Sequence, residues 1–167
     1  MTPRYAAVDA HYPDEGGARA ALVVATEPRF ATLVEERVTT VGAVPAYRPG
    51  FFFERELPAI RAVLATTAPV DLLVVDGYVD LDPAGRPGLG ARLHAEIDTP
   101  VVGVAKTAFR SATHALPVVR GGARPLYVTA AGIPVDEAAA LVSAMAGAHR
   151  IPDALRRVDR LARSVPG

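Results

Sequence analysis

The sequence contains no cysteine. Disulfides, thiolate metal sites and cysteine nucleophiles are therefore excluded, and any metal must be bound by carboxylates, histidines or backbone oxygens. The N-terminus lacks the long apolar core of a signal peptide, and no stretch approaches the length of a membrane-spanning helix. From these absences we expect a cytoplasmic protein.

A net charge is also missing, because 18 Lys and Arg residues balance 18 Asp and Glu residues. A protein that binds duplex nucleic acid only through phosphates is usually more basic, so this balance argues mildly against that mode. A local basic patch could still bind nucleic acid. Hydrophobic residues make up 50% of the 167-residue chain, which predicts one folded domain over residues 1–167.

Apolar runs separated by turn residues predict a mixed α/β fold. Three strands are expected at residues 5–12, 18–27 and 31–41, and their short connections predict an antiparallel meander. The elements expected next are a helix, a strand, a helix, a strand, a short hairpin and two helices, at residues 53–66, 69–77, 88–97, 99–106, 115–130, 134–148 and 151–163. This order is typical of a mixed sheet that helices cover.

Acidic residues stand at the ends of two predicted strands. Asp9 follows the apolar run YAAV, and Asp76 follows DLLVV. Because chemistry in open α/β sheets collects where parallel strands end, both could point into one cleft. Glu56 begins the intervening helix, and Asp159 in the last helix is a fourth candidate. Converging acids suit Mg²⁺, which binds one or two carboxylates together with substrate phosphate oxygens, and two such ions can assist phosphodiester cleavage.

Each acid also has a simpler structural interpretation. The dipeptide Asp76–Gly77 could be a turn, and Glu56 could complement a helix dipole. Asp159 could form solvated pairs with the arginines around it. Asp9 is harder to explain in this way, because aspartate is depleted in strands. The residues alone leave both interpretations open.

Four segments follow one another in a distinctive order: YAAVDAHY at 5–12, YRPGFFFERELPAI at 47–60, PVDLLVVDGY at 69–78 and TPVVGVAKTAF at 99–109. Together they resemble the endonuclease V family, the deoxyinosine-directed nucleases with an RNase H-like fold. The second matches the family's loop of tyrosine, any residue, proline, glycine and phenylalanine, and the fourth matches its P-x-x-GVAK strand. A weaker fifth segment extends the resemblance to residue 163. The resemblance implies an RNase H-like mixed sheet, with an antiparallel meander and parallel strands flanked by helices.

A metal-dependent catalytic site is implied by the same resemblance. It places Asp9, Glu56 and Asp76 at a divalent metal, with Asp159 as a further group on the metal side. Lys106 matches the family's active-site lysine and would contact phosphate. The implied reaction is Mg²⁺-dependent hydrolysis one phosphodiester beyond inosine on its 3′ side, with Mn²⁺ able to replace Mg²⁺.

The substrate side is implied by the matches around these groups. Arg55 would contact phosphate beside the metal. The remaining expected substrate-binding residues lie in two places. Tyr47, Pro49, Gly50 and Phe51 would form a wedge that separates the nucleic-acid strands next to the lesion. Gly77 and Tyr78 lie in the turn after Asp76. The expected partner is DNA or RNA that contains inosine, which would place the protein in DNA repair.

Differences from the family pattern fall mainly on this substrate side. Tyr78 replaces a usual histidine, Asp82 replaces another, and Pro49 is retained where the family usually has two prolines. Because the acids are retained while the substrate contacts differ, we expect the same phosphodiester cleavage on a different substrate. That substrate could be RNA, a single strand or another modified base. Two alternatives are a non-catalytic nucleic-acid-binding module on the same fold and a metal-dependent hydrolase of a small nucleotide.

Overall fold

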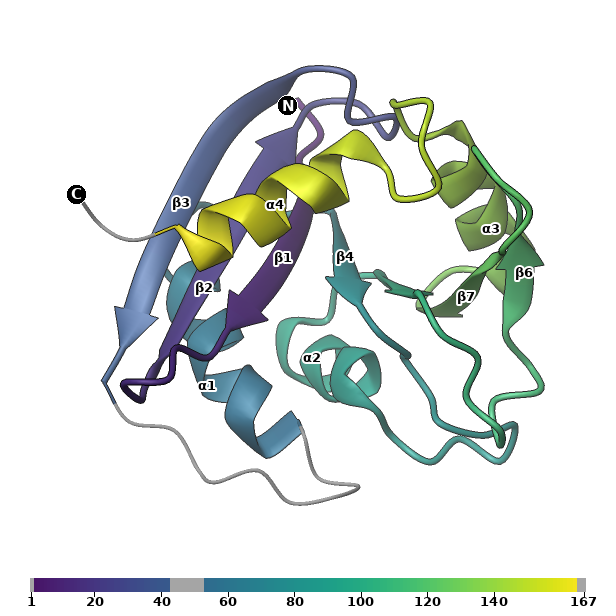
Figure 1. The fold of residues 1–167 in the computed structure, drawn as a ribbon, viewed down its shortest axis with the longest axis horizontal. Coiled ribbons are helices and arrows are strands. Elements are labelled where there is room, and N and C mark those ends of the chain that lie inside the picture. Colours follow the sequence, from purple (N-terminus) through teal and green to yellow (C-terminus); the bar gives the residue numbers. More distant parts are fainter. Residues whose placement is uncertain (1, 43–52, 165–167) are drawn as a thin grey trace.

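The computed structural model of the chain describes residues 2–42 and 53–164. Within these ranges one sheet has the strand order β3-β2-β1-β4-β5-β7-β6 (Figure 1). Its strands are β1 (Tyr5–His11), β2 (Ala18–Ala25), β3 (Leu33–Val41), β4 (Leu72–Asp76), β5 (Val101–Ala105), β6 (Leu116–Val118) and β7 (Leu126–Ala131). None of the helices in these ranges is long and apolar enough to cross a membrane.

The pairing of the strands confirms the predicted mixed sheet. β1, β2 and β3 form an antiparallel meander. β1, β4 and β5 are parallel neighbours, so their carboxyl ends lie along one end of the sheet. β7 pairs antiparallel with β5, and β6 with β7. Three adjacent parallel strands thus form the centre of the sheet, which is where ligands of α/β proteins bind.

Four helices of the described chain cover the two faces of this sheet (Figure 1). They are α1 (Phe53–Leu64), α2 (Leu89–Ile97), α3 (Val135–Ala144) and α4 (Asp153–Arg163). Successive residues of a strand point to opposite faces. In β1, Ala7 belongs to the core that includes α3 and α4, whereas Ala6 and Val8 belong to the core that includes α1 and α2. The same alternation determines on which face of the sheet the side chains that follow Val8 in β1 lie.

Element boundaries differ most at the third helix, which was predicted over 134–148 and ends at Ala144. The guanidinium group of Arg120 donates hydrogen bonds to the carbonyl oxygens of Val142 (2.8 Å), Met145 (2.9 Å) and Gly147 (2.9 Å). The carbonyls of Met145 and Gly147 lie beyond the end of the helix, and that of Val142 lies in its last turn, where carbonyl groups lack the regular helical partner. A side chain distant in sequence therefore stabilises the turn that the local sequence did not reveal.

Candidate active site

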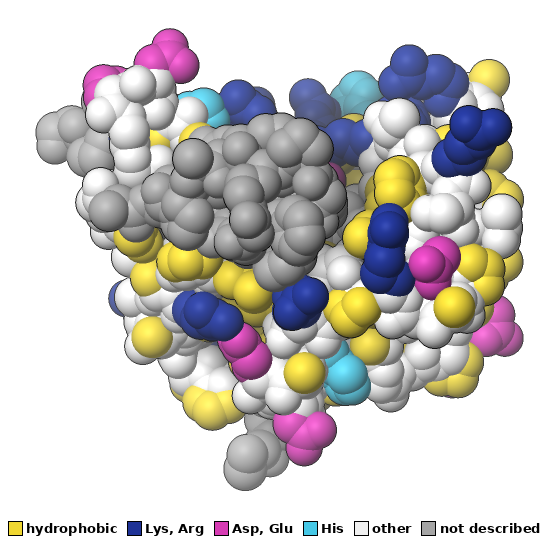
Figure 2. Space-filling model, turned by 90° about the horizontal axis from the view of Figure 1, so that it is seen from below, with side chains coloured by type: hydrophobic (Ala, Val, Ile, Leu, Met, Phe, Trp, Pro, Cys, Tyr) yellow, Lys and Arg dark blue, Asp and Glu magenta, His cyan; other side chains and the backbone are white. Residues whose placement is uncertain are grey.

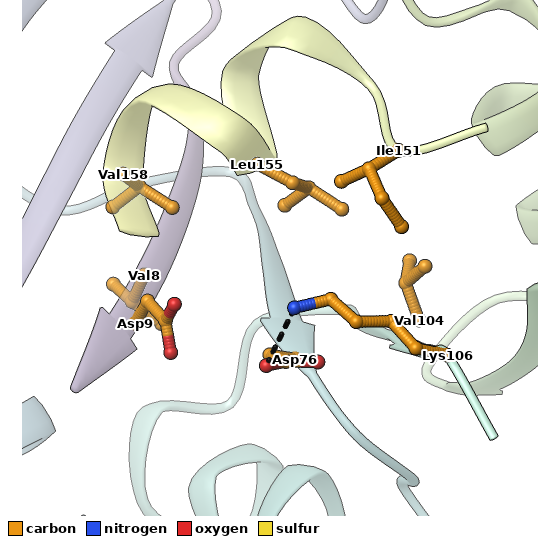
Figure 3. A pocket seen from close by; sticks show the side chains of 8 residues that line it. All are labelled: Val8, Asp9, Asp76, Val104, Lys106, Ile151, Leu155 and Val158. Atoms are coloured by element: carbon orange, nitrogen blue, oxygen red, sulfur yellow. Dashed lines mark ion pairs between the residues drawn. The ribbon is translucent and has the colours of Figure 1, made fainter. Parts of the chain in front are cut away.

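A pocket opens where β1, β4 and β5 end, beneath α4 (Figure 3). Its polar groups are Asp9, Asp76 and Lys106, which come from three different strands or strand ends. Its remaining walls are aliphatic and consist of Val8, Val104, Ile151, Leu155 and Val158. The pocket therefore places two carboxylates and one ammonium group against an apolar wall.

Strand register explains why the two aspartates meet. Val8 of β1 is the Cα partner of Val75 in β4, and the strands are parallel. The next residue on each strand is therefore an aspartate, and both aspartates point to the face that α4 covers. Figure 3 shows Asp9 and Asp76 directed toward the same space. The sequence prediction that two acids at strand ends share a cleft agrees with this placement.

Asp9 lies in an environment that disfavours its charge. Burial, followed by the negative charge of Asp76, raises the pKa of its carboxyl group to about 7. A hydrogen bond with the Asp159 carboxyl group raises the pKa further, while the backbone N–H of Ala10, which donates to Oδ1 at 2.9 Å, lowers it. Asp9 is thus a carboxyl group that ionises only near neutral pH, and a bound cation would favour its ionised form.

Asp159 approaches the site from α4 and has two partners. Burial raises its pKa, but hydrogen bonds from Arg163 and with Asp9 outweigh this effect, so the net shift is downward. The Arg163 guanidinium lies 2.9 Å from Asp159 Oδ1, four residues along the same helix. Asp159 therefore forms the helix ion pair of its structural interpretation and also lies beside Asp9, while its expected role on the metal side stays a prediction.

Lys106 lies one residue beyond β5 and extends back over the strand ends (Figure 3). Its Nζ is 3.5 Å from Asp76 Oδ2, and the two side chains are 44% and 41% exposed. An ion pair this exposed contributes little to stability, on the order of 1 kcal/mol or less. The arrangement is better suited to presenting a positive charge to a bound anion than to holding the fold together.

Glu56 lies in the first turns of α1, which belongs to the opposite helical layer. The first turn of α1 is nevertheless at the same end of the sheet as the carboxyl end of β1 (Figure 1). The pocket lining within the described residues does not include Glu56, and no group of three or more His, Asp or Glu in those residues could hold a metal ion. The structure therefore places Asp9 beside Asp76 and beside Asp159, and leaves the expected role of Glu56 a prediction.

The donor set in this pocket fits a divalent cation. Asp76 lies close enough to Asp9 for its charge to raise the pKa of the Asp9 carboxyl group. A cation between them would replace this repulsion with attraction, and carboxylate oxygens are the ligands that hard divalent ions prefer. Two carboxylates also suffice for Mg²⁺, which retains waters or substrate oxygens in its remaining positions.

Tyr78 lies in a different environment from the one expected of a substrate-binding residue. The side chain is 9% exposed. Its hydroxyl donates to the carbonyl oxygen of Thr107 (2.8 Å) and accepts from the backbone N–H of Phe109 (2.9 Å). The phenol therefore fixes the segment after Lys106, because burial of the ring requires that its hydroxyl find partners within the protein.

Gly77 begins the turn that carries Tyr78, with φ of 114°. This turn lies directly against β5, where a Cβ on Gly103 would be 2.5 Å from the carbonyl oxygen of Gly77. Thr129 of β7 is 2% exposed, and its hydroxyl accepts a hydrogen bond from the backbone N–H of Val79 (2.8 Å). Small and polar residues on the neighbouring strands thus hold the turn that follows Asp76.

Several expected substrate-side residues lie outside the part of the chain that the structure describes. They are the proposed wedge residues Tyr47, Pro49, Gly50 and Phe51, and the side chain of Arg55. The sequence allowed a helix ion pair between Asp159 and any of the arginines around it, and the structure shows that the partner is Arg163, four residues later. Sequence reasoning did not find the contacts of Tyr78, which join residues about thirty positions apart.

Comparisons with known proteins find similar sequences and similar folds. The family model described as Endonuclease V matches residues 2–132. An endonuclease V of Streptomyces avermitilis is 32% identical over 97% of this chain and 80% of the relative. A crystal structure of the endonuclease V from that organism has a TM-score of 0.81 at 31% identity, and the match covers 97% of this chain and 80% of that one.

The fold is also shared with more distant structures. Endonuclease V of Ciona intestinalis, crystallised with a DNA that contains an inosine followed by a ribo-adenosine, has a TM-score of 0.80 at 18% identity. That match covers 96% of this chain and 83% of the other. The sheet described above is the RNase H-like mixed sheet of these proteins.

Proposed function

Because this chain belongs to the endonuclease V family, we propose that it is a divalent-metal-dependent endonuclease that cleaves DNA or RNA on the 3′ side of inosine. Its relatives are nucleases that hydrolyse nucleic acid, and the distant Ciona intestinalis protein was crystallised with inosine-containing DNA. The observation that carries the proposal is the meeting of Asp9 and Asp76 at the ends of parallel strands, with Lys106 beside them.

The roles of the acids follow from their surroundings. We assign metal binding to Asp9 and Asp76, with Glu56 as a third ligand and Mg²⁺ as the ion. When bound, Mg²⁺ would supply a Lewis acid for the phosphate and an activated water. Asp159 orients Asp9 through their shared hydrogen bond. Arg163 favours the ionised form of the Asp159 carboxyl, so below about pH 7 the proton of this pair lies on Asp9.

Lys106 has the geometry of a phosphate-binding group. Its ammonium group is half exposed and is held over the strand ends by an ion pair with Asp76. As the phosphate gains negative charge during hydrolysis, a fixed ammonium group stabilises that charge more than the ground state. The contacts of Tyr78 with Thr107 and Phe109 restrict the segment from which this lysine extends. Arg55 and the wedge are assigned to the substrate by their match to the family.

The proposal is tested by mapping cleavage of matched oligonucleotides. Single-stranded and duplex DNA, and single-stranded RNA, each with one inosine or with adenosine at that position, are incubated with Mg²⁺ or Mn²⁺. We expect inosine-dependent cleavage one phosphodiester beyond the inosine on its 3′ side. A chelator should abolish it.

Two variants separate catalysis from folding. Asp76→Asn removes one charge from the pocket and should lower kcat at least 100-fold, whereas Asp136→Asn changes an exposed acid in the first turn of α3 and should leave cleavage unchanged. Binding without cleavage under every metal condition would instead support a non-catalytic binding module. Release of product only from mononucleotides would support a small-nucleotide hydrolase.

A further inference from the structure

A second cavity, of about 240 Å³, adjoins the active-site pocket. Lys106 lines both, so the two cavities lie on either side of this lysine. The other side chains of the second cavity that matter here are Arg124, Tyr127 and Arg150. We call these four residues the basic groove. A nucleic-acid strand with one phosphate bound at Lys106 would contact this groove with its neighbouring nucleotide.

The basic groove is positively charged, and no acidic side chain lines it among the described residues. Arg124 is exposed, and its guanidinium group has no acidic partner within the part of the chain that the structure describes. Among the described residues, Lys106 forms its ion pair with Asp76 of the neighbouring pocket. Figure 2 shows that Lys and Arg side chains gather along the upper right of the molecule, at the end of the sheet that carries the site. An unneutralised groove of this kind attracts anions.

Arg150 gives the groove a fixed shape. Its Nε donates to the carbonyl oxygen of Arg124 (3.1 Å), and its Nη2 donates to the carbonyl oxygens of Pro125 (2.9 Å) and Lys106. One side chain thus joins the end of β5 to the turn before β7. Its Nη1 has no partner among the described residues and is available to a ligand.

Tyr127 adds an aromatic surface to these cations. It lies on β7 in register with Ala105, the residue before Lys106. The ring is half buried, and it packs against the cluster that contains Tyr78 and Ala112. Cations beside a fixed aromatic ring are the combination by which proteins bind single-stranded nucleic acid, because phosphates meet the cations and bases stack on the ring.

We propose that the basic groove binds one nucleotide of the substrate strand, next to the phosphodiester that is cleaved. Arg124 and the Nη1 of Arg150 bind its phosphate, and Tyr127 stacks against its base. This inference rests on the proposed function, since it assigns a further contact to the same substrate. Stacking and phosphate contacts accept any base, so the groove contributes affinity and alignment and leaves the recognition of inosine to the active-site side.

The groove is tested by binding measurements that do not require cleavage. Fluorescence anisotropy of a labelled single-stranded DNA, with and without inosine, is measured in EDTA at a series of salt concentrations. Arg124→Gln should reduce the slope of log Kd against log salt by about 0.7, the value for one phosphate contact on a single strand. Arg124→Lys should restore the slope. Tyr127→Leu keeps an apolar side chain in the cluster and should raise Kd about 5-fold or more, with the slope unchanged.

Arg29→Gln is the matched control, because it removes an exposed arginine at the opposite end of the sheet, just after β2. It should change neither Kd nor the salt slope, and circular dichroism should show that all four variants fold. If both Arg124→Gln and Tyr127→Leu leave Kd and the salt slope unchanged, the basic groove does not bind the substrate strand. That result would leave the proposed function intact. Absence of any binding by the unsubstituted protein in EDTA would also overturn the groove, whereas failure of the proposed function would show in the cleavage assay with Mg²⁺ or Mn²⁺.

Discussion

Replacing Asp9 by Asn should make the metal-free protein more stable at alkaline pH while abolishing its activity. Burial and the charge of Asp76 raise the pKa of Asp9 from 3.8 to about 7. The native state therefore holds a proton that the unfolded chain loses above pH 3.8, and ionised Asp9 destabilises the fold. The cost begins near pH 4, grows as pH rises, and is complete above pH 7.

The magnitude follows from the size of the shift. At about 1.4 kcal/mol per pKa unit, ionised Asp9 destabilises the native state by about 4 kcal/mol above pH 7. The lowered pKa of Asp159 has the opposite sign and offsets part of this amount. The Asn side chain retains an oxygen that can accept from the N–H of Ala10. The expected gain in the free energy of unfolding is therefore about 2–4 kcal/mol at pH 8 and near zero at pH 4.

Urea denaturation followed by circular dichroism, in EDTA at pH 4, 6 and 8, measures this gain. Asp136→Asn serves as a control and should lose less than about 1 kcal/mol at every pH, because it weakens only a favourable interaction with a helix dipole. Adding Mg²⁺ or Mn²⁺ at pH 8 should stabilise the unsubstituted protein and not Asp9→Asn. A gain that is absent at pH 8, or equal at pH 4 and pH 8, would refute the electrostatic account of Asp9.

Three further predictions concern the residues that support the site. Lys106→Ala should change the free energy of unfolding by less than about 1 kcal/mol, because its ion pair with Asp76 is exposed, yet lower kcat about 100- to 1,000-fold. Tyr78→Phe should cost about 0.5–1.5 kcal/mol in thermal or urea unfolding, because it removes the hydrogen bonds of the hydroxyl with the Thr107 carbonyl and the Phe109 N–H; an unchanged stability would contradict its structural role. Gly103→Ala places a Cβ 2.5 Å from the Gly77 carbonyl oxygen and should destabilise by at least about 1–3 kcal/mol, whereas a stable variant would show that the turn after Asp76 can move.

The sequence predicted the order of the elements because each strand or helix is set by neighbouring residues. Apolar runs with turn residues between them located the strands, and the scarcity of aspartate in strands singled out Asp9. The pairing of Asp9 with Asp76 followed from the rule that parallel strands end together. These inferences needed only local pattern and strand direction.

The parts that sequence reasoning missed depend on contacts between distant residues. Arg120 ends α3 by binding carbonyl oxygens more than twenty positions away. Tyr78 was expected on the substrate side because it replaces a family histidine, but its hydroxyl binds the segment at Thr107 and Phe109. Arg150 likewise gives the basic groove its shape through backbone atoms, which carry no sequence signal. Motif matching identifies which residue types occupy a position, and the fold decides what those side chains touch.

A crystal of the protein soaked in Mn²⁺ tests the central claim most directly, since the anomalous signal of Mn²⁺ locates the ion without reference to activity. The account predicts one strong peak within coordination distance of both Asp9 and Asp76, with Glu56 as a further ligand, and loss of that peak in Asp9→Asn. A crystal that binds Mn²⁺ only elsewhere, or not at all at millimolar concentration, would contradict the assignment of this pocket as the metal site.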